Sequence, residues 1–180
     1  MRTNIQYDEA VNVCKDVFIR KTQDYGTSWR VLRMISIVDQ IFIKAQRIRT
    51  IQEKQTQRIG DDIKSEFVGI VNYGLIGLIQ LEKGTSVIED LDSEMVSALY
   101  EEKISIAREL MQDKNHDYGE AWRDMSQESF TDLILVKLLR IRQILSNEGK
   151  TIMSEGIDAN LLDIINYALF ALILIHEGKQ

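Results

Sequence analysis

Polar side chains stand in the C-terminal part of the chain where the pattern otherwise indicates a hydrophobic core. Glu155, Asp163 and Asn166 project to one side of a helix that advances ~100° per residue. The segment LLDIINYALF around the last two is otherwise almost entirely apolar. A buried polar group without a partner costs several kcal/mol, so Asp163 and Asn166 must have partners.

Two kinds of partner fit Asp163. With Glu155 it would offer Mg²⁺ the carboxylate oxygens that this hard cation prefers, while retained waters leave room for substrate phosphates. Alternatively, Asp163 pairs with Lys137 or Arg140 on a neighbouring helix, because buried charges are usually paired. Asn166 then bonds across the bundle. The residues alone leave both alternatives open.

Lys137 and Arg140 lie three residues apart on one polar stripe. Arginine offers a planar fork of donors and lysine a point charge, so the two residues could bind phosphate. Lys44 and Arg47 have the same spacing earlier in the chain. The alternative is ordinary pairing of these cations with acids on the next helix.

The motif K-x-x-D-Y-G-x-x-W-R begins at Lys114 and combines a cation, a carboxylate, a glycine and two aromatic rings. Glycine permits φ > 0 and aspartate bonds to nearby backbone, so the middle of the motif predicts a turn. Asp117 and Tyr118 at this turn could help hold a base, which would stack on the aromatic rings. Alternatively, Trp122 only fills the end of a helical bundle.

The same motif occurs twice. It also begins at Lys21, 93 residues before Lys114, and the match continues without a gap through S-x-x-D and K-x-x-R-I-R. A later dipeptide, Asn-Tyr, recurs at 72–73 and 166–167, 94 residues apart. A duplicated unit constrains the architecture more firmly than any single motif, so we expect two copies of one structural unit.

Composition and spacing predict that each copy is helical. The chain is 44% apolar and 28% charged and contains no proline, as is ordinary for a helical protein. A first amphipathic helix carries Cys14 as a small core residue and ends at the turn of the motif. We expect second helices at 37–54 and 130–147, capped by Ser36 and Ser129.

Third helices are predicted at 61–82 and 154–176. The fold class is therefore all-α, a helical bundle of two pseudo-symmetric three-helix repeats. Repeat 1 covers 1–84, repeat 2 covers 92–180, and 85–91 form a linker. Each half is too small for a comfortable core, so we expect one fused domain over 1–180.

Charge and hydropathy limit the partners. The net charge of −6 argues against direct nucleic-acid binding. The N-terminus lacks the apolar run of a secretory signal, and ALFALILI is shorter than the roughly 20 residues that span a bilayer. We expect a cytoplasmic protein that does not enter membranes; whether it forms a homodimer is left open.

The two copies differ where the acids stand. At the positions of Glu155, Ala159, Asp163 and Asn166, the first repeat has Asp61, Ser65, Gly69 and Asn72. If this face binds metal, the second repeat is expected to bind it better, and the first to be structural or to contribute other surfaces.

The ordered motifs K-x-x-D-Y-G, K-x-x-R-I and D-x-x-N-Y resemble the nucleotide modification associated domain, first type, of bacterial and phage proteins. That family is similar to the all-α nucleoside triphosphate pyrophosphohydrolases, MazG-like and dimeric dUTPase-like. The resemblance implies a helical bundle of paired units whose acids hold Mg²⁺ on a nucleotide.

The resemblance also implies a role for each polar residue at a position that matches the family's motifs. It makes Glu155 and Asp163 metal ligands and Asn166 their neighbour. Lys137 and Arg140 would contact phosphate, and the nucleotide would be bordered by Lys114, Asp117 and Tyr118. The pattern departs from the family at Ala159, where an acid is usual, and from the pyrophosphohydrolases in having K-x-x-R instead of E-x-x-E.

These implications favour a nucleotide-handling protein. The leading hypothesis is a Mg²⁺-dependent nucleoside triphosphate pyrophosphohydrolase acting on a nucleotide or small phosphorylated molecule. The alternative is a non-catalytic helical module for nucleotide binding or for assembly. The two departures leave nucleotide binding better supported than turnover.

Overall fold

A computed structural model describes residues 2–55 and 62–179, and within them it is all-helical. The first repeat supplies α1 (Arg2–Tyr25), η1 (Ser28–Val31), α2 (Met34–Lys54) and α3 (Ile63–Lys83). The second supplies α4 (Ser93–Tyr118), η2 (Ala121–Asp124), α5 (Gln127–Ser146) and α6 (Ile157–His176). The predicted all-α class is confirmed, and the second repeat runs through the same series of elements as the first.

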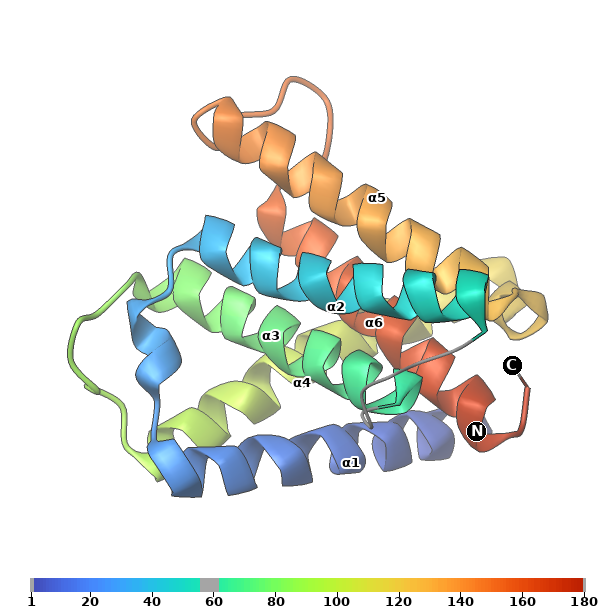
Figure 1. Ribbon diagram of the computed structural model, residues 1–180, viewed down its shortest axis with the longest axis horizontal. Coiled ribbons are helices and arrows are strands. Elements are labelled where there is room, and N and C mark those ends of the chain that lie inside the picture. Colours follow the sequence, from blue (N-terminus) through green and yellow to red (C-terminus); the bar gives the residue numbers. More distant parts are fainter. Residues whose placement is uncertain (1, 56–61, 180) are drawn as a thin grey trace.

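The helices pack in three layers of two (Figure 1), and each repeat gives one helix to every layer. Helices α3 and α6 form the middle layer, with α2 and α5 on one side and α1 and α4 on the other. The middle helices are apolar nearly all round, which is the pattern of a buried helix. Their contact is close: a side-chain Cβ at Gly74 would lie 2.6 Å from Ile165 Cγ1.

The core reaches from this middle layer into the outer ones. Ile37 and Ile41 from α2, Cys14 from α1 and Tyr100 from α4 are fully buried. Cys14 is a core residue, as predicted, and burial raises the pKa of its thiol to about 12. At neutral pH the thiol is therefore protonated and unreactive.

Among the described helices, only α6 is long and apolar enough to cross a membrane. In the most hydropathic window of that helix, 72% lies buried inside the bundle. The central helix of a soluble protein passes the same test, so this property is weak evidence for a span.

The ion pairs across the outer layers occur twice. In each second pair, the residues 93 positions away take the same roles, so that the acid and the base come from the opposite repeats. Asp8 of α1 accepts from Arg108 of α4 at 2.9 Å, and the equivalent pair is Glu101 with Lys15. Between α2 and α5, Asp39 pairs with Arg142 at 2.8 Å, and the equivalent residues Asp132 and Arg49 pair at 3.4 Å. The repeats thus face each other about a pseudo-twofold axis.

The predicted caps at Ser36 and Ser129 are wrong. Helix α2 begins at Met34 after Arg33, so Ser36 lies inside its first turn. In α5 the cap is Ser126, whose hydroxyl accepts from the backbone N–H of Ser129. A capping side chain must stand ahead of the first free N–H groups, and the predicted serines stand three residues too late.

The remaining helix ends lie close to the predicted ones. α3 ends at Lys83 before Gly84, which adopts φ 72°, and Asp92 caps α4 through the N–H of Met95. The predicted linker 85–91 lies between these two helices. α6 begins at Ile157 and not at 154, while the predicted start of the third helix at 61 lies outside the described residues.

Candidate functional site

Each repeat encloses a cavity between its own helices, and the two cavities have equivalent walls. The first cavity, about 840 Å³, lies among α1, η1, α2 and α3. The second, about 420 Å³, lies among α4, η2, α5 and α6. Every wall residue of the second cavity except Glu155 has its repeat-related counterpart in the wall of the first. The counterpart of Glu155 is Asp61, which lies outside the described residues.

The 93- and 94-residue spacings relate the polar and aromatic wall residues of the two cavities in pairs. The pairs are Lys21 and Lys114, Thr22 and Asn115, Tyr25 and Tyr118, Trp29 and Trp122, Lys44 and Lys137, Gly69 and Asp163, Asn72 and Asn166, and Tyr73 and Tyr167.

The second cavity contains a closed charge cluster around Asp163. Its carboxylate is buried, Oδ1 accepts from Lys114 Nζ at 2.7 Å, and Oδ2 pairs with Lys137 Nζ at 2.8 Å. Partial burial lowers the pKa of Lys114, but the hydrogen bond and charge of Asp163 outweigh it and raise that pKa above its usual value. The structure thus has the ion pair that was one of the two sequence alternatives.

This cluster bears on the predicted Mg²⁺ site. Both oxygens of Asp163 are already bound by lysines, and Glu155 is exposed at the rim of the cavity. Within residues 2–55 and 62–179 there is no group of three His, Cys, Asp or Glu side chains placed to hold a metal ion. The side chains described therefore do not fit a resident metal ion in this arrangement, and the metal role of Glu155 and Asp163 stays a prediction.

The other predicted contacts are spread around the second cavity. Tyr118 lines it and is 74% exposed, whereas Asp117 stands outside the wall and contacts His116 at 3.1 Å. Arg140 is exposed and does not line the cavity. The structure brings together Lys114, Lys137, Asp163, Glu155, Asn166 and Tyr118, but not Asp117 or Arg140.

Asn166 is held by both repeats. Its Oδ1 accepts from the hydroxyl of Tyr7 in α1 at 2.7 Å, and its Nδ2 donates to the carbonyl of Ala107 in α4 at 3.0 Å. In the first repeat, Asn72 accepts from Tyr100 at 2.9 Å and donates to the carbonyl of Cys14 at 3.0 Å.

The two tyrosines were not recognised as partners in the sequence. Tyr7 and Tyr100 are 93 residues apart, so the duplication extends ahead of the repeated motif and could have indicated them. Burial raises the pKa of both hydroxyls, which therefore stay protonated donors. The prediction that Asn166 bonds across the bundle is confirmed; its contact with a ligand stays a prediction.

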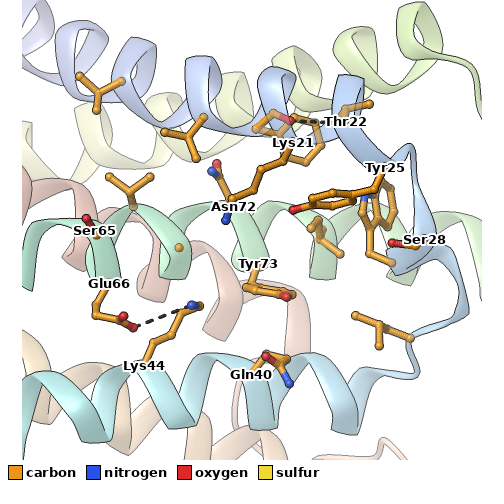
Figure 2. A pocket seen from close by; sticks show the side chains of 18 of the residues that line it. Lys21, Thr22, Tyr25, Ser28, Gln40, Lys44, Ser65, Glu66, Asn72 and Tyr73 are labelled. Carbon is orange, nitrogen blue, oxygen red and sulfur yellow. Dashed lines mark hydrogen bonds and ion pairs between the residues drawn. The ribbon is translucent and has the colours of Figure 1, made fainter. Parts of the chain in front are cut away.

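The first cavity has the same lysines but no equivalent of Asp163. Figure 2 shows Lys21 pointing from α1 into the space in front of α3, with Lys44 rising toward α3 from α2. Lys21 has no hydrogen bond or ion pair with any residue that the structure describes. Lys64 is a third lysine in this wall, and Tyr25 and Tyr73 add aromatic surface.

Lys44 is only loosely paired. Its Nζ lies 3.8 Å from Glu66 Oε2, while Glu66 Oε1 accepts from Arg47 at 2.9 Å. The same Nζ stands 5.8 Å from the ring centroid of Tyr73. A Cβ added at Gly69 would lie 2.8 Å from Lys44 Cε, so the lysine chain passes over the glycine.

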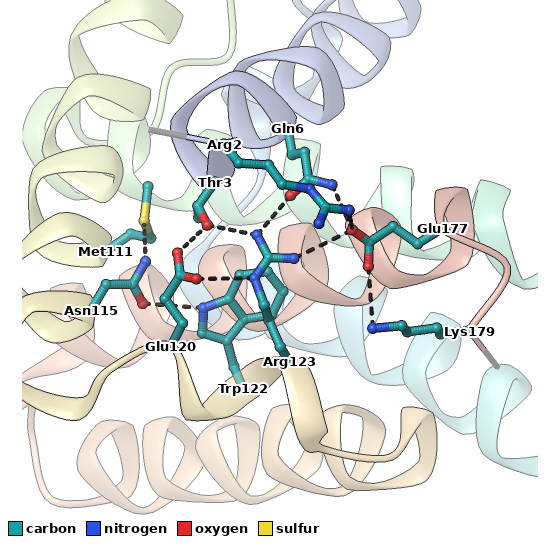
Figure 3. Close-up of polar contacts among 10 residues, drawn as sticks. All are labelled: Arg2, Thr3, Gln6, Met111, Asn115, Glu120, Trp122, Arg123, Glu177 and Lys179. Carbon is teal, nitrogen blue, oxygen red and sulfur yellow. Dashed lines mark hydrogen bonds and ion pairs between the residues drawn. The ribbon is translucent and has the colours of Figure 1, made fainter.

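Turns and 3-10 helices position the aromatic end of each cavity. Gly26 and Gly119 adopt φ 68° and 64°, which ends α1 and α4 beside Tyr25 and Tyr118. Figure 3 shows Arg123 of η2 among Thr3, Gln6, Glu120 and Glu177, so this arginine ties η2 to both ends of the chain. Its counterpart Arg30 is buried and bonds to Asp90 at 2.9 Å and to Gln80.

The two tryptophans fill the bundle, as one alternative predicted, but their N–H groups differ. Trp122 stacks on Phe170 at 4.2 Å between ring centroids and donates from Nε1 to Asn115 at 3.1 Å. Trp29 is as buried as Trp122, yet its Nε1 has no partner among the described residues, because Asn115 is replaced by Thr22.

The acids of the sequence predict a site in the second repeat. The structure makes the first cavity the larger one and leaves its lysines less engaged. The signal was available in the sequence: Lys21 and Lys44 are retained although Gly69 stands in place of the acid.

A family model described as nucleotide modification associated domain 1 matches residues 21–81 and 114–175. The two matched segments cover more than half of the chain and coincide with the two repeats. No curated protein and no solved structure matches the chain. The wider similarity to MazG-like pyrophosphohydrolases therefore stays a hypothesis. This chain belongs to the nucleotide modification associated domain 1 family and carries the domain twice.

Proposed function

We propose that this protein binds a nucleotide in the first cavity. The observation that carries the proposal is the convergence of Lys21, Lys44 and Lys64 from three helices on one open cavity with aromatic walls. The volume of about 840 Å³ lies within the usual range of small-molecule sites, roughly 300–1,000 Å³.

The wall provides for both parts of a nucleotide. Lysine ammonium groups are mobile point charges that suit phosphate oxygens. The rings of Tyr25 and Tyr73 offer surfaces on which a base can stack, an interaction of about 1–3 kcal/mol per base in nucleic-acid sites. Gln40, Ser28 and Ser65 add polar groups that could orient the base or sugar.

The charge in the two walls supports the first cavity over the second. The described wall of the first holds three lysines against Asp62 and Glu66, and Asp62 is engaged as the cap of α3. The second wall balances two lysines with Glu155 and Asp163. Among the wall residues that the structure describes, an excess of lysines over acids is therefore found in the first cavity and not in the second.

Binding is the proposal that the geometry supports better than hydrolysis. A nucleoside triphosphate brings Mg²⁺ on its own phosphates, and the ion keeps several waters when few carboxylates are offered. A Mg²⁺ requirement, turnover to monophosphate and pyrophosphate, a cytoplasmic location, and the lack of direct nucleic-acid and membrane binding stay predictions. Homodimer formation is still open.

The test is calorimetric titration of the protein with nucleoside mono-, di- and triphosphates and with the matching nucleosides, with and without Mg²⁺. We expect one site per chain and tighter binding of nucleotides than of nucleosides. Lys21→Gln is expected to weaken nucleotide binding about tenfold, the loss of ~1.4 kcal/mol. Arg20→Gln, which removes the same charge one residue away outside the cavity wall, is the matched control.

The proposal is wrong if no nucleotide binds, or if the two variants weaken binding equally. Chromatography of the same mixtures addresses catalysis. Pyrophosphate and monophosphate formed by the unmutated protein would add the pyrophosphohydrolase reaction to the binding function.

A further inference from the structure

The second repeat indicates where the anionic group of a ligand lies in the first. We infer that a phosphate group binds between Lys21 and Lys44 beside Gly69, in the position that the carboxylate of Asp163 takes between Lys114 and Lys137. In this view Asp163 is a built-in occupant of the second cavity, and the first repeat keeps the same site open. The inference rests on the proposed function for the identity of the ligand.

In the second cavity the position between the two lysines is filled. Two lysines from two different helices close on one carboxylate at 2.7 and 2.8 Å, and Asp163 is nearly fully buried. A carboxylate with both oxygens bound by ammonium groups occupies the position that two oxygens of a phosphate would take.

The first cavity retains the two lysines but has glycine in place of the aspartate. Lys21 and Lys44 stand at the positions of Lys114 and Lys137 on the corresponding helices. Nothing in the described part of the chain pairs with Lys21, and the carboxylate nearest to Lys44 is already bonded to Arg47. Two lysines facing one cavity without a carboxylate between them repel each other, and an entering anion would relieve that repulsion.

The first cavity has room for an anionic group beside Gly69. Gly69 has no side chain, and the atoms nearest to its absent Cβ belong to the flexible end of Lys44. That end can swing aside when a ligand enters or when a side chain is added. The first cavity is also twice the volume of the second, so a group larger than a carboxylate can enter.

The ligand group that fits this arrangement is a phosphate or diphosphate. It carries more charge than a carboxylate and offers more acceptor oxygens to two or three lysines. Nucleotide phosphates and free pyrophosphate share this chemistry, and the experiment separates them.

The experiment places a carboxylate at position 69 and, in a second variant, removes the one at position 163. Gly69→Asp supplies the first cavity with its own carboxylate, and calorimetry then measures binding of pyrophosphate and of the best nucleotide. Both affinities are expected to fall at least about tenfold. Gln46→Glu, with the same charge change at an exposed position of α2 outside the wall, should leave them within about twofold. Circular dichroism and thermal unfolding are measured as well, to check that the Gly69→Asp variant is folded.

The reciprocal variant, Asp163→Ala, opens the second cavity. We expect pyrophosphate to bind at two sites per chain and to raise the melting temperature of Asp163→Ala more than that of the unmutated protein. One site per chain with an unchanged affinity would overturn the idea that Asp163 is an internal occupant.

Failure of this inference can be told apart from failure of the proposed function. Nucleotide binding that is unaffected by Gly69→Asp overturns the phosphate position but leaves the function standing. Pyrophosphate binding that Gly69→Asp abolishes, without binding of any nucleotide, supports the phosphate position and removes the nucleotide function. No binding of either probe overturns both.

Discussion

The two cavities are built at equivalent positions of the two repeats, and the difference between Gly69 and Asp163 decides the charge inside each. Both have a pair of lysines at equivalent positions, a tyrosine at the turn, a buried tryptophan and an asparagine bonded to a tyrosine of the opposite repeat. Asp163 closes one charge cluster, and Gly69 leaves the other open. The shared lysines are thus neutralised inside one cavity and left available to a ligand in the other.

The largest effects are expected where the repeats agree. Asn166→Ala leaves the buried Tyr7 hydroxyl and the Ala107 carbonyl without partners, at about 1–3 kcal/mol each. Asn72→Ala likewise leaves the hydroxyl of Tyr100 and the backbone carbonyl of Cys14 without partners. We expect each variant to lose about 3 kcal/mol in urea unfolding. A much smaller loss in one repeat would break the equivalence of the two asparagines.

The next largest effect on the unfolding free energy is expected to differ between the two repeats. Asp163→Ala leaves Lys137, which is 12% exposed, beside Lys114, which is 47% exposed. Breaking a buried pair costs about 3–5 kcal/mol, and solvent around Lys114 reduces this to about 2 kcal/mol. Gly69→Asp should instead leave the unfolding free energy equal or higher. An unharmed Asp163→Ala protein would favour the metal hypothesis for this acid.

A smaller effect is expected at the tryptophans. Thr22→Asn would place in the first repeat the amide that accepts from Trp122 in the second. The buried N–H of Trp29 would then gain a hydrogen bond worth about 1 kcal/mol. Thermal unfolding should show the gain in Thr22→Asn but not in Thr22→Val, which adds no acceptor.

The smallest effect is the pH dependence of the Lys114 contact. Its pKa is raised in the folded state, so the stabilisation is fully present below the unfolded value, about 10.4, and is lost as pH rises through the folded pKa. Lys114→Met should therefore lower the unfolding free energy at pH 8. At pH 11, where the lysine is partly neutral, the same substitution should lower it by a smaller amount. Lys21→Met, which removes no ion pair within the described residues, should show no such step.

The sequence predicts the fold well because its signals are local or repeated. The duplication, the helical spacing and the glycine turns depend on neighbouring residues, and the structure agrees with them. The caps at Ser36 and Ser129 failed because the capping position depends on where the chain leaves the preceding 3-10 helix. The tyrosines that donate to Asn72 and Asn166 come from the opposite repeat, and sequence spacing within one repeat cannot reveal them.

The candidate site was predicted less well for a physical reason. Carboxylates can bind a metal ion only if their oxygens are not already paired with cations. The sequence does not show that two lysines pair with Asp163. Lys114 was assigned to the nucleotide, although in the structure it pairs with that acid. The pairing alternative named the right kind of partner and one of the two lysines.

The paired ion pairs between α1 and α4, and between α2 and α5, bear on how substitutions can accumulate in the two repeats. Two identical single-repeat chains could form the same contacts as a symmetric dimer, but every substitution would then alter both cavities together. Joining the repeats in one polypeptide removes that constraint. One cavity can be filled by its own side chain and stabilise the fold, while the other can gain affinity for a ligand.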